Sequence, residues 1–265
     1  MALIQSMEAT GAKLFKYRGQ IPVLIFAFAI PILISSDDCL SESLYYSCHA
    51  STIVTILAIL VTLAGLALRA YTVSTTPKGT SGRNTSSQVA NTLNTKGIYS
   101  VVRHPLYLAN YLIWLGTLIY SRNIYVLVIV SLVYWIYYER IMMAEESYLR
   151  GKFGDTFEEW AAKVPAFLPK WSLYEGGMLQ FSWKTFIRRE YATWLSTIYS
   201  YLATDWILYQ LWNAREAACY GPIDGSYVKD HAVILWIAIA YTIIALIIKL
   251  IKHKTTWLDA TPDRD

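Results

Sequence analysis

The stretch GIYSVVRHPLYLANY, from Gly97 to Tyr111, places a basic pair and a proline directly before an apolar run. Proline is tolerated in the first turn of a helix, and it disfavours helical geometry in the residue before it. The stretch therefore predicts a short extended segment that ends at His104, followed by an apolar helix from Leu106. The basic pair either anchors this helix at the membrane surface or lines a site.

The composition of the whole chain indicates a membrane protein. Of its 265 residues, 55% are hydrophobic and 16% are charged, whereas soluble domains carry about 25% charged residues. The apolar residues gather in blocks that approach the roughly 20 residues a helix needs to cross the hydrocarbon core. The predicted spans are Ile21–Ser35, Ser51–Ala70, Leu106–Tyr120, Ile124–Tyr138, Tyr191–Trp212 and Ala232–Leu250. We therefore expect an all-α, polytopic membrane protein with about six transmembrane helices and cytoplasmic interfacial helices.

The distribution of lysine and arginine predicts the orientation of these spans. Basic residues are frequent in the N-terminal segment, after the second and fourth spans, and in the C-terminal tail, and they are sparse in the other loops. Since lysine and arginine favour the cytoplasmic side, both termini are expected in the cytoplasm, in a bacterial inner membrane or an ER-type membrane. The net charge of +4 then follows from topology, and no nucleic-acid partner is expected.

The cysteines fall on the non-cytoplasmic side of this topology. They are Cys39, Cys48 and Cys219. A disulfide between Cys39 and Cys48 and unpaired thiols both remain open, because the redox state of that compartment is not fixed by the sequence. The chain has no CxxC motif and no paired histidine spacing, so no metal site is expected.

The polar region from Glu139 to Trp171 has a clear pattern. Its first part continues the helix of the fourth span, and Gly151 and Gly154 are expected to interrupt it. The segment Thr156–Lys163 predicts a short amphipathic helix, and the two prolines of VPAFLP predict extended chain. Further along, FSWKTFIRRE mixes aromatic and basic residues, which is typical of an interfacial helix before the fifth span.

Three groups of charged residues have two interpretations each. Arg103 is either a surface anchor or a bidentate partner for a carboxylate or phosphate. Glu145 and Glu146 are either a solvated helix end or the partners of a cationic ligand group. The basic residues of FSWKTFIRRE either anchor the protein at the membrane or bind an anionic lipid head group; they are Lys184, Arg188 and Arg189.

The combination of these motifs is more specific than any one of them. It resembles the isoprenylcysteine carboxyl methyltransferase and phospholipid methyltransferase superfamily of integral membrane enzymes, over about a quarter of the chain. The matching residues of the first motif are Gly97, Tyr99, Arg103, His104, Pro105 and Tyr107. Those of the second are Glu145, Glu146, Leu149, Phe153, Gly154, Phe157, Trp160, Val164, Pro165, Phe167 and Pro169.

The resemblance implies S-adenosylmethionine as methyl donor and a lipid or lipidated acceptor in the bilayer. The α-carboxylate of the donor suits Arg103 or His104, and its α-ammonium suits Glu145 or Glu146. Its adenosine is expected against VPAFLP. The predicted donor-binding residues are Tyr99, His104, Tyr107, Glu145, Glu146, Pro165 and Phe167, with Arg103 as the catalytic cation that holds the acceptor oxygen. Lys184, Arg188 and Arg189 are the predicted acceptor-binding residues.

Two features depart from the family pattern. Ala109 stands where many members have glycine. The motifs usually lie near the C-terminus, whereas here two further predicted spans follow them. We therefore divide the chain into an N-terminal two-span region with a polar cytoplasmic loop (1–96), a methyltransferase core (97–171) and a C-terminal extension (172–265) that begins with the interfacial helix.

The resulting functional hypothesis is O-methylation of an anionic lipid or lipidated acceptor. The acceptor group is either a lipid phosphate, such as that of lipid A, or a carboxylate of the prenylcysteine type. Two other enzyme classes remain open, an NADPH-dependent membrane reductase of the sterol type and a phospholipid amine N-methyltransferase. The paired glutamates favour a methyl donor over NADPH, because a 2′-phosphate calls for more cationic residues.

Overall fold

Helices make up nearly all of the regular structure. The computed structural model describes residues 3–35, 48–77, 90–177, 179–220 and 227–259. The helices are α1 (Leu3–Lys16), α2 (Ile21–Ser35), α4 (Cys48–Thr75), α5 (Pro105–Tyr120), α6 (Ile124–Phe153), α7 (Asp155–Lys163), α8 (Trp183–Tyr220), α9 (Tyr227–Asp230) and α10 (Ala232–Lys254). Two 3₁₀ turns lie at Ile98–Ser100 and Trp171–Leu173. No strand is present within the described ranges, apart from an isolated bridge between Gly97 and Glu175.

The all-α membrane fold predicted from the sequence is confirmed. Each of the predicted spans falls on a helix. Three of the described helices are long and apolar enough to cross a membrane by themselves, Thr52–Thr75, Ile124–Phe153 and Ala232–Lys254, and Leu24–Ser35 is a shorter apolar helix. The 16 residues of α5 reach about 24 Å at 1.5 Å per residue. The number of six spans stays a prediction.

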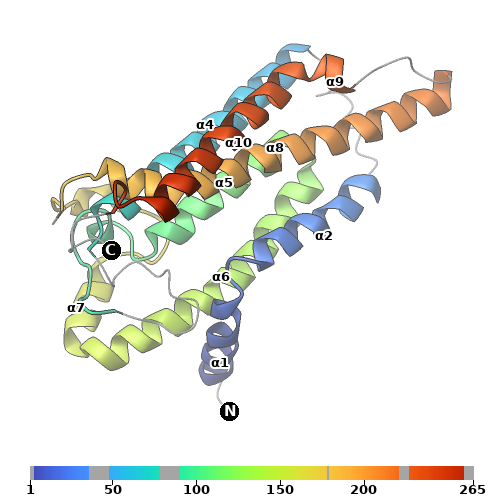
Figure 1. Cartoon of the computed structure of the whole chain (residues 1–265). Helices are drawn as coiled ribbons and strands as arrows, with labels where there is room; N and C mark the ends of the chain where they lie inside the picture. Colours follow the sequence, from blue (N-terminus) through green and yellow to red (C-terminus); the bar gives the residue numbers. More distant parts are fainter. Residues whose placement is uncertain (1–2, 36–47, 78–89, 178, 221–226, 260–265) are drawn as a thin grey trace.

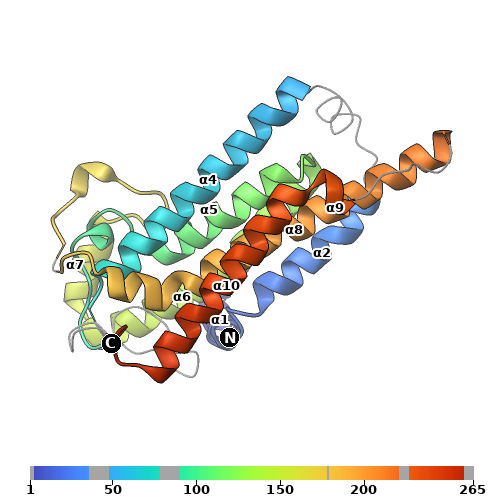
Figure 2. The same ribbon diagram turned by 45° about the horizontal axis from the view of Figure 1, so that its top comes forward.

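The long helices lie side by side in one bundle (Figures 1 and 2). Helix α4 packs along α5 and α8, α10 packs along α8, and α6 contacts α1, α2 and α5. Helix α7 lies at one end of the bundle together with the C-terminus, and α9 lies at the other end (Figure 1). The segments before α5 and after α7, which belong to the two sequence motifs, therefore meet at the α7 end, which we call the motif end.

The crossing of α4 and α5 depends on small residues. A Cβ atom built on Gly65 would lie 2.8 Å from the carbonyl oxygen of Ala109, and one on Gly116 would lie 2.6 Å from the carbonyl oxygen of Ala58. Small residues let helix backbones approach closely, which is how many membrane helices associate. Ala109 is completely buried in this crossing, so the alanine at the family's glycine position serves as a small contact residue.

The polar region after the fourth span largely folds as predicted. Helix α6 continues to Phe153, and Gly154 ends it with φ of +52°, a left-handed conformation that glycine adopts without strain. Helix α7 begins one residue later. Gly151 does not interrupt the helix; it stays within α6, where a Cβ would meet nothing within 4 Å. An exposed glycine weakens a helix but does not break it.

Helix α8 corrects one prediction. The basic segment at Lys184–Arg189 is not a separate interfacial helix, because α8 runs without interruption from Trp183 to Tyr220. No proline or glycine occurs within these 38 residues, so nothing breaks the helix. Its length of about 57 Å exceeds the roughly 30 Å of hydrocarbon. Cys39 lies outside the described residues, as do the side chains of Cys48 and Cys219, so the disulfide stays untested.

Candidate functional site

The two sequence motifs are joined by backbone hydrogen bonds at the motif end. The extended segment before α5 donates to the segment that follows α7, and one bond returns in the opposite direction. The pairs are Arg103 N to Pro165 O (2.9 Å), His104 N to Ala166 O (3.1 Å) and Lys170 N to Val101 O (2.9 Å). The VPAFLP segment is therefore held against the segment that carries the basic pair, although about 60 residues separate them in sequence.

Helix α7 adds two side-chain contacts to this junction. The indole nitrogen of Trp160 donates to the carbonyl oxygen of Tyr99 at 3.1 Å. The Nη1 atom of Arg103 donates to the carbonyl oxygen of Ala161 at 3.0 Å. Phe157, on the same helix, is completely buried and makes an edge contact with the Trp160 ring. These contacts set the position and direction of the Arg103 side chain.

Glu146 of α6 lies against the basic pair. Its Oε1 atom is 2.8 Å from Nε2 of His104 and 3.1 Å from Nε of Arg103. His104 caps the N-terminus of α5, and its side chain is almost completely buried. The residues from the two motifs thus form one ionic cluster.

Glu145 faces the same cluster from the adjacent position on α6. Its carboxylate accepts a hydrogen bond from the Tyr107 hydroxyl at 2.8 Å and lies 3.7 Å from Nδ1 of His104. Arg18, between α1 and α2, approaches it to 3.6 Å. No motif predicts Arg18 at this place, because it is 79 residues before Gly97, where the first motif begins, and its charge is equally explained by topology.

The charges of the cluster control the protonation of His104. Burial alone disfavours the imidazolium ion, but hydrogen bonds and charges from Glu145 and Glu146 outweigh burial and raise the pKa of His104 above its ordinary value. The cluster thus combines the guanidinium groups of Arg18 and Arg103 and the imidazole of His104 with two carboxylates. Such an alternation of charges can bind a zwitterion, with each charge of the ligand next to an opposite charge of the protein.

One polar atom in the cluster is not satisfied. The Nε–H group of Arg103 is buried and has no hydrogen-bond acceptor among the described residues, although Glu146 lies at ion-pair distance. Buried N–H groups nearly always have an acceptor. A carboxylate or phosphate oxygen of a ligand would supply one.

The remaining predicted donor-binding residues surround the cluster. Tyr107 is buried and its ring lies against His104, with centroids 5.7 Å apart. Tyr99 and Pro165 are partly exposed next to Arg103. Phe167 points toward the helices and makes edge contacts with Tyr111 of α5 and Trp135 of α6. It therefore lies on the bilayer side of the junction.

The predicted acceptor-binding residues lie on the first two turns of α8. Lys184 is exposed and Arg188 and Arg189 are partly buried. Nη1 of Arg188 is 3.1 Å from Asp259, in the segment that follows α10. Two turns into α8, Glu190 forms a second ionic group with Arg69 and Asn110. Nothing in the sequence predicts this group, because the positive charge of Arg69 is equally explained by membrane topology.

No group of three or more His, Cys, Asp or Glu side chains that could hold a metal ion occurs in the part of the chain that the structure describes.

Comparison with known proteins confirms the resemblance for the middle of the chain. Residues 53–156 match the model of the phospholipid methyltransferase family. This match includes most of α4 as well as α5 and α6, and it ends in α7. This part of the chain is thus similar to the phospholipid methyltransferase family and to enzymes named protein-S-isoprenylcysteine O-methyltransferase.

Individual relatives are similar over the same part. The protein-S-isoprenylcysteine O-methyltransferase of Schizosaccharomyces pombe is 39% identical over 77 residues, 29% of this chain and 33% of its own. A probable enzyme of that name from Oryza sativa subsp. indica is 40% identical over 78 residues, 29% of this chain and 40% of its own. The cobalt-zinc-cadmium resistance protein CzcN of Cupriavidus metallidurans is 37% identical over 91 residues, 34% of this chain and 42% of its own.

The similarity to these relatives is partial. The chain matches only about a third to two fifths of their lengths, and the second half of the chain, with α8 and α10, lies mostly outside the matches. No solved structure matches the chain.

Proposed function

We propose that this chain is a membrane methyltransferase that binds S-adenosylmethionine at the ionic cluster of the motif end. The observation that carries the proposal is the junction of Arg103 and His104 with Glu146, because it joins the two family motifs into one site. The similarity to named methyltransferases supports the same reaction class.

The residues present fit the amino-acid part of this donor. Its α-ammonium would lie against Glu145 and Glu146, and its α-carboxylate would accept the unsatisfied Nε–H of Arg103. The amino-acid part of the donor is a zwitterion, so this part adds no net charge to the cluster. The partly exposed Tyr99 and Pro165 offer the neighbouring surface for the adenosine. The sulfonium group of the bound donor supplies an electrophilic methyl group.

The protein's part in such a reaction is positioning and exclusion of water. The hydrogen-bonded junction and the packing of α7 hold Arg103 in one direction, and an acceptor oxygen that carries negative charge needs a cation for alignment but no general base. We propose that the acceptor is an anionic lipid or lipidated group, O-methylated at a phosphate or carboxylate oxygen. It reaches the site from the bilayer, on the side of Phe167 and Trp135.

The positions of the termini support the proposed orientation. The N-terminal helix packs on the motif-end half of α6, and the segment after α10 meets the start of α8. Helix α1, the described segment after α10 and the basic start of α8 thus lie toward the motif end, which is the arrangement expected if that end faces the cytoplasm.

The test is equilibrium binding of labelled S-adenosylmethionine to the purified full-length protein in detergent. We expect binding that S-adenosylhomocysteine displaces and that NADPH does not. Tight binding of NADPH alone would establish the reductase alternative instead. Mass spectrometry of lipids from cells with and without the protein would then identify the acceptor by one added methyl group.

A further inference from the structure

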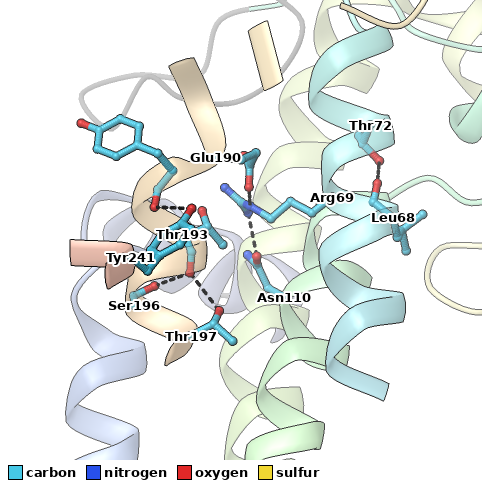
Figure 3. Close-up of polar contacts among 10 residues, drawn as sticks. Leu68, Arg69, Thr72, Asn110, Glu190, Thr193, Ser196, Thr197 and Tyr241 are labelled. Carbon is cyan, nitrogen blue, oxygen red and sulfur yellow. Dashed lines mark hydrogen bonds and ion pairs between the residues drawn. The ribbon is translucent and has the colours of Figure 1, made fainter. Parts of the chain in front are cut away.

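Arg69, Asn110 and Glu190 join three helices at one point inside the bundle (Figure 3). Nε of Arg69, on α4, donates to Oε2 of Glu190, on α8, at 2.7 Å, and Nη1 of Arg69 donates to Oδ1 of Asn110, on α5, at 2.7 Å. We call these residues the inner cluster. Each of the three residues lies five to seven residues inside its helix, counted from the helix end at the motif end. This corresponds to about 8–10 Å along the helix axis.

An ion pair at this depth is costly to build. Moving charges out of water carries a penalty that their mutual attraction often fails to repay, and ionisable residues within membrane helices generally mark functional sites. Replacing the pair by apolar residues would hold α4 and α8 together equally well. The inner cluster therefore calls for an explanation beyond packing.

One atom of the inner cluster has no hydrogen bond. Oε1 of Glu190 is buried and has no partner among the described residues, and the Glu190 residue is only 1% exposed. A buried carboxylate oxygen without a hydrogen-bond donor is rare. The missing partner must therefore be a group that carries a hydrogen atom to donate.

Arg69 limits the identity of this partner further. Its side chain is 20% exposed, and the two hydrogen bonds above use two of the five N–H donors of a guanidinium group. A ligand that fits the inner cluster must therefore accept from Arg69 and donate to Glu190. Carboxylates and phosphodiesters have no hydrogen to donate, and an ammonium group has no lone pair to accept.

A singly protonated phosphate monoester meets both requirements. Its P–OH group donates to a carboxylate, and its other oxygens accept from a guanidinium group. Phosphate monoesters have a second pKa of about 6, so this form predominates below about pH 6 and is the minor form at about pH 7. A neutral hydroxyl also donates and accepts, but the basic residues Lys184, Arg188 and Arg189, on the turns of α8 just before Glu190, favour an anion.

We propose that the inner cluster is a head-group subsite for a lipid phosphate monoester, with Glu190 accepting its P–OH hydrogen and Arg69 binding its charged oxygens. This inference rests on the proposed function, because it makes the phosphate the acceptor group. The inner cluster is next to the ionic cluster. Asn110 is three residues from Tyr107 on α5, and Tyr107 donates to Glu145 and lies against the His104 ring, with centroids 5.7 Å apart.

The experiment compares lipids that differ only at the phosphate. The full-length protein is placed in phosphatidylcholine nanodiscs that contain a small fraction of phosphatidic acid, phosphatidylmethanol or diacylglycerol. Native mass spectrometry then measures the lipid that the protein retains. We expect about tenfold more phosphatidic acid than phosphatidylmethanol, because the latter has a charged oxygen but no P–OH. Diacylglycerol should be retained no better than phosphatidylcholine.

Two results would overturn the inference without a variant. Equal retention of phosphatidic acid and phosphatidylmethanol would show that only charge is recognised. Retention of diacylglycerol at the level of phosphatidic acid would show that a hydroxyl, and not a phosphate, fills the subsite. Binding of labelled S-adenosylmethionine is measured on the same preparation. If the donor binds but the lipid preference is absent, only this inference fails; if the donor does not bind, the proposed function fails.

Glu190→Gln tests the role of the carboxylate. Glutamine offers N–H donors to a phosphodiester oxygen, so the variant should retain phosphatidylmethanol and phosphatidic acid about equally. Glu158→Gln is the matched control, because Glu158 also pairs with an arginine, Arg150, but at an exposed position; this variant should keep the wild-type preference. A preference unchanged in Glu190→Gln would contradict the assignment.

Discussion

Gly65 of α4 and Ala109 of α5 bring two helix backbones into direct contact beside the candidate site. A Cβ atom on Gly65 would lie 2.8 Å from the carbonyl oxygen of Ala109 and 2.8 Å from the backbone nitrogen of Ile113. Ala109 lies five residues after His104 and one before Asn110. The close crossing therefore fixes the position of both clusters relative to α4.

Gly65→Ala should destabilise the protein by about 1–3 kcal/mol, because the added methyl group overlaps backbone atoms that cannot move independently. Thermal unfolding in detergent measures the effect. Gly151→Ala is the control, since a Cβ there meets nothing within 4 Å, and alanine at an exposed helix position should raise stability slightly. Equal effects of the two substitutions would contradict the described crossing.

His104 should make stability depend on pH. The glutamates raise the pKa of His104 in the folded protein above that of the unfolded chain. The corresponding stabilisation is therefore complete below the unfolded pKa of about 6.5 and is lost as the pH rises through the higher folded pKa. His104→Asn should consequently destabilise the protein more at about pH 6 than at about pH 9.

Thermal unfolding across this pH range measures the difference between wild type and variant. The control is His253→Asn, because His253 is exposed near the end of α10 and an exposed side chain contributes little to folding. If the difference in unfolding temperature between wild type and His104→Asn stays constant with pH, the imidazole does not interact with the glutamates as described.

Glu146→Gln should weaken binding of S-adenosylmethionine by about tenfold or more, because a charge-assisted hydrogen bond contributes about 1.5–3 kcal/mol. Glutamine has nearly the same shape, so the fold should be preserved, and a single cooperative unfolding transition checks this; its temperature should be lower than that of the wild type, because the charge pairs with Arg103 and His104 are lost. Glu158→Gln should leave the affinity unaltered. Donor binding that survives Glu146→Gln at full strength would remove Glu146 from the site.

The local structure of the motifs could be predicted because it depends on neighbouring residues. Pro105 determines where α5 begins, and Gly154 determines where α6 ends. The two prolines keep VPAFLP out of a helix, but the segment bends at Ala166–Leu168 and is not extended throughout, contrary to the prediction. The ionic cluster was predictable only through the family resemblance, since no spacing rule relates Arg103 to Glu146 across 43 residues.

The parts that were not predicted depend on tertiary packing. Arg18 and Arg69 have the charge expected of cytoplasmic segments, and nothing in their neighbours indicates that Glu145 and Glu190 lie opposite. The change from basic to apolar residues near Glu190 predicts a boundary between two helices. Helix α8 is continuous there, because this change of polarity brings no proline or glycine that would interrupt the backbone. Ala109 acquires a role only when α4 is placed against it.

Replacement of Lys184, Arg188 and Arg189 together by glutamine should reduce methylation of the lipid acceptor while leaving S-adenosylmethionine binding intact. These residues lie on α8, whereas the proposed donor-binding groups lie before α5, on α6 and after α7. Loss of positive charge at the membrane surface lowers the local concentration of an anionic lipid by an amount that depends on salt. The defect should accordingly be largest at low ionic strength.

A matched variant, Arg150→Gln with Lys152→Gln and Lys163→Gln, removes the same charge from α6 and α7 and should have a smaller effect on acceptor use. If the α8 variant loses donor affinity instead, its basic residues belong to the donor site and not to the acceptor.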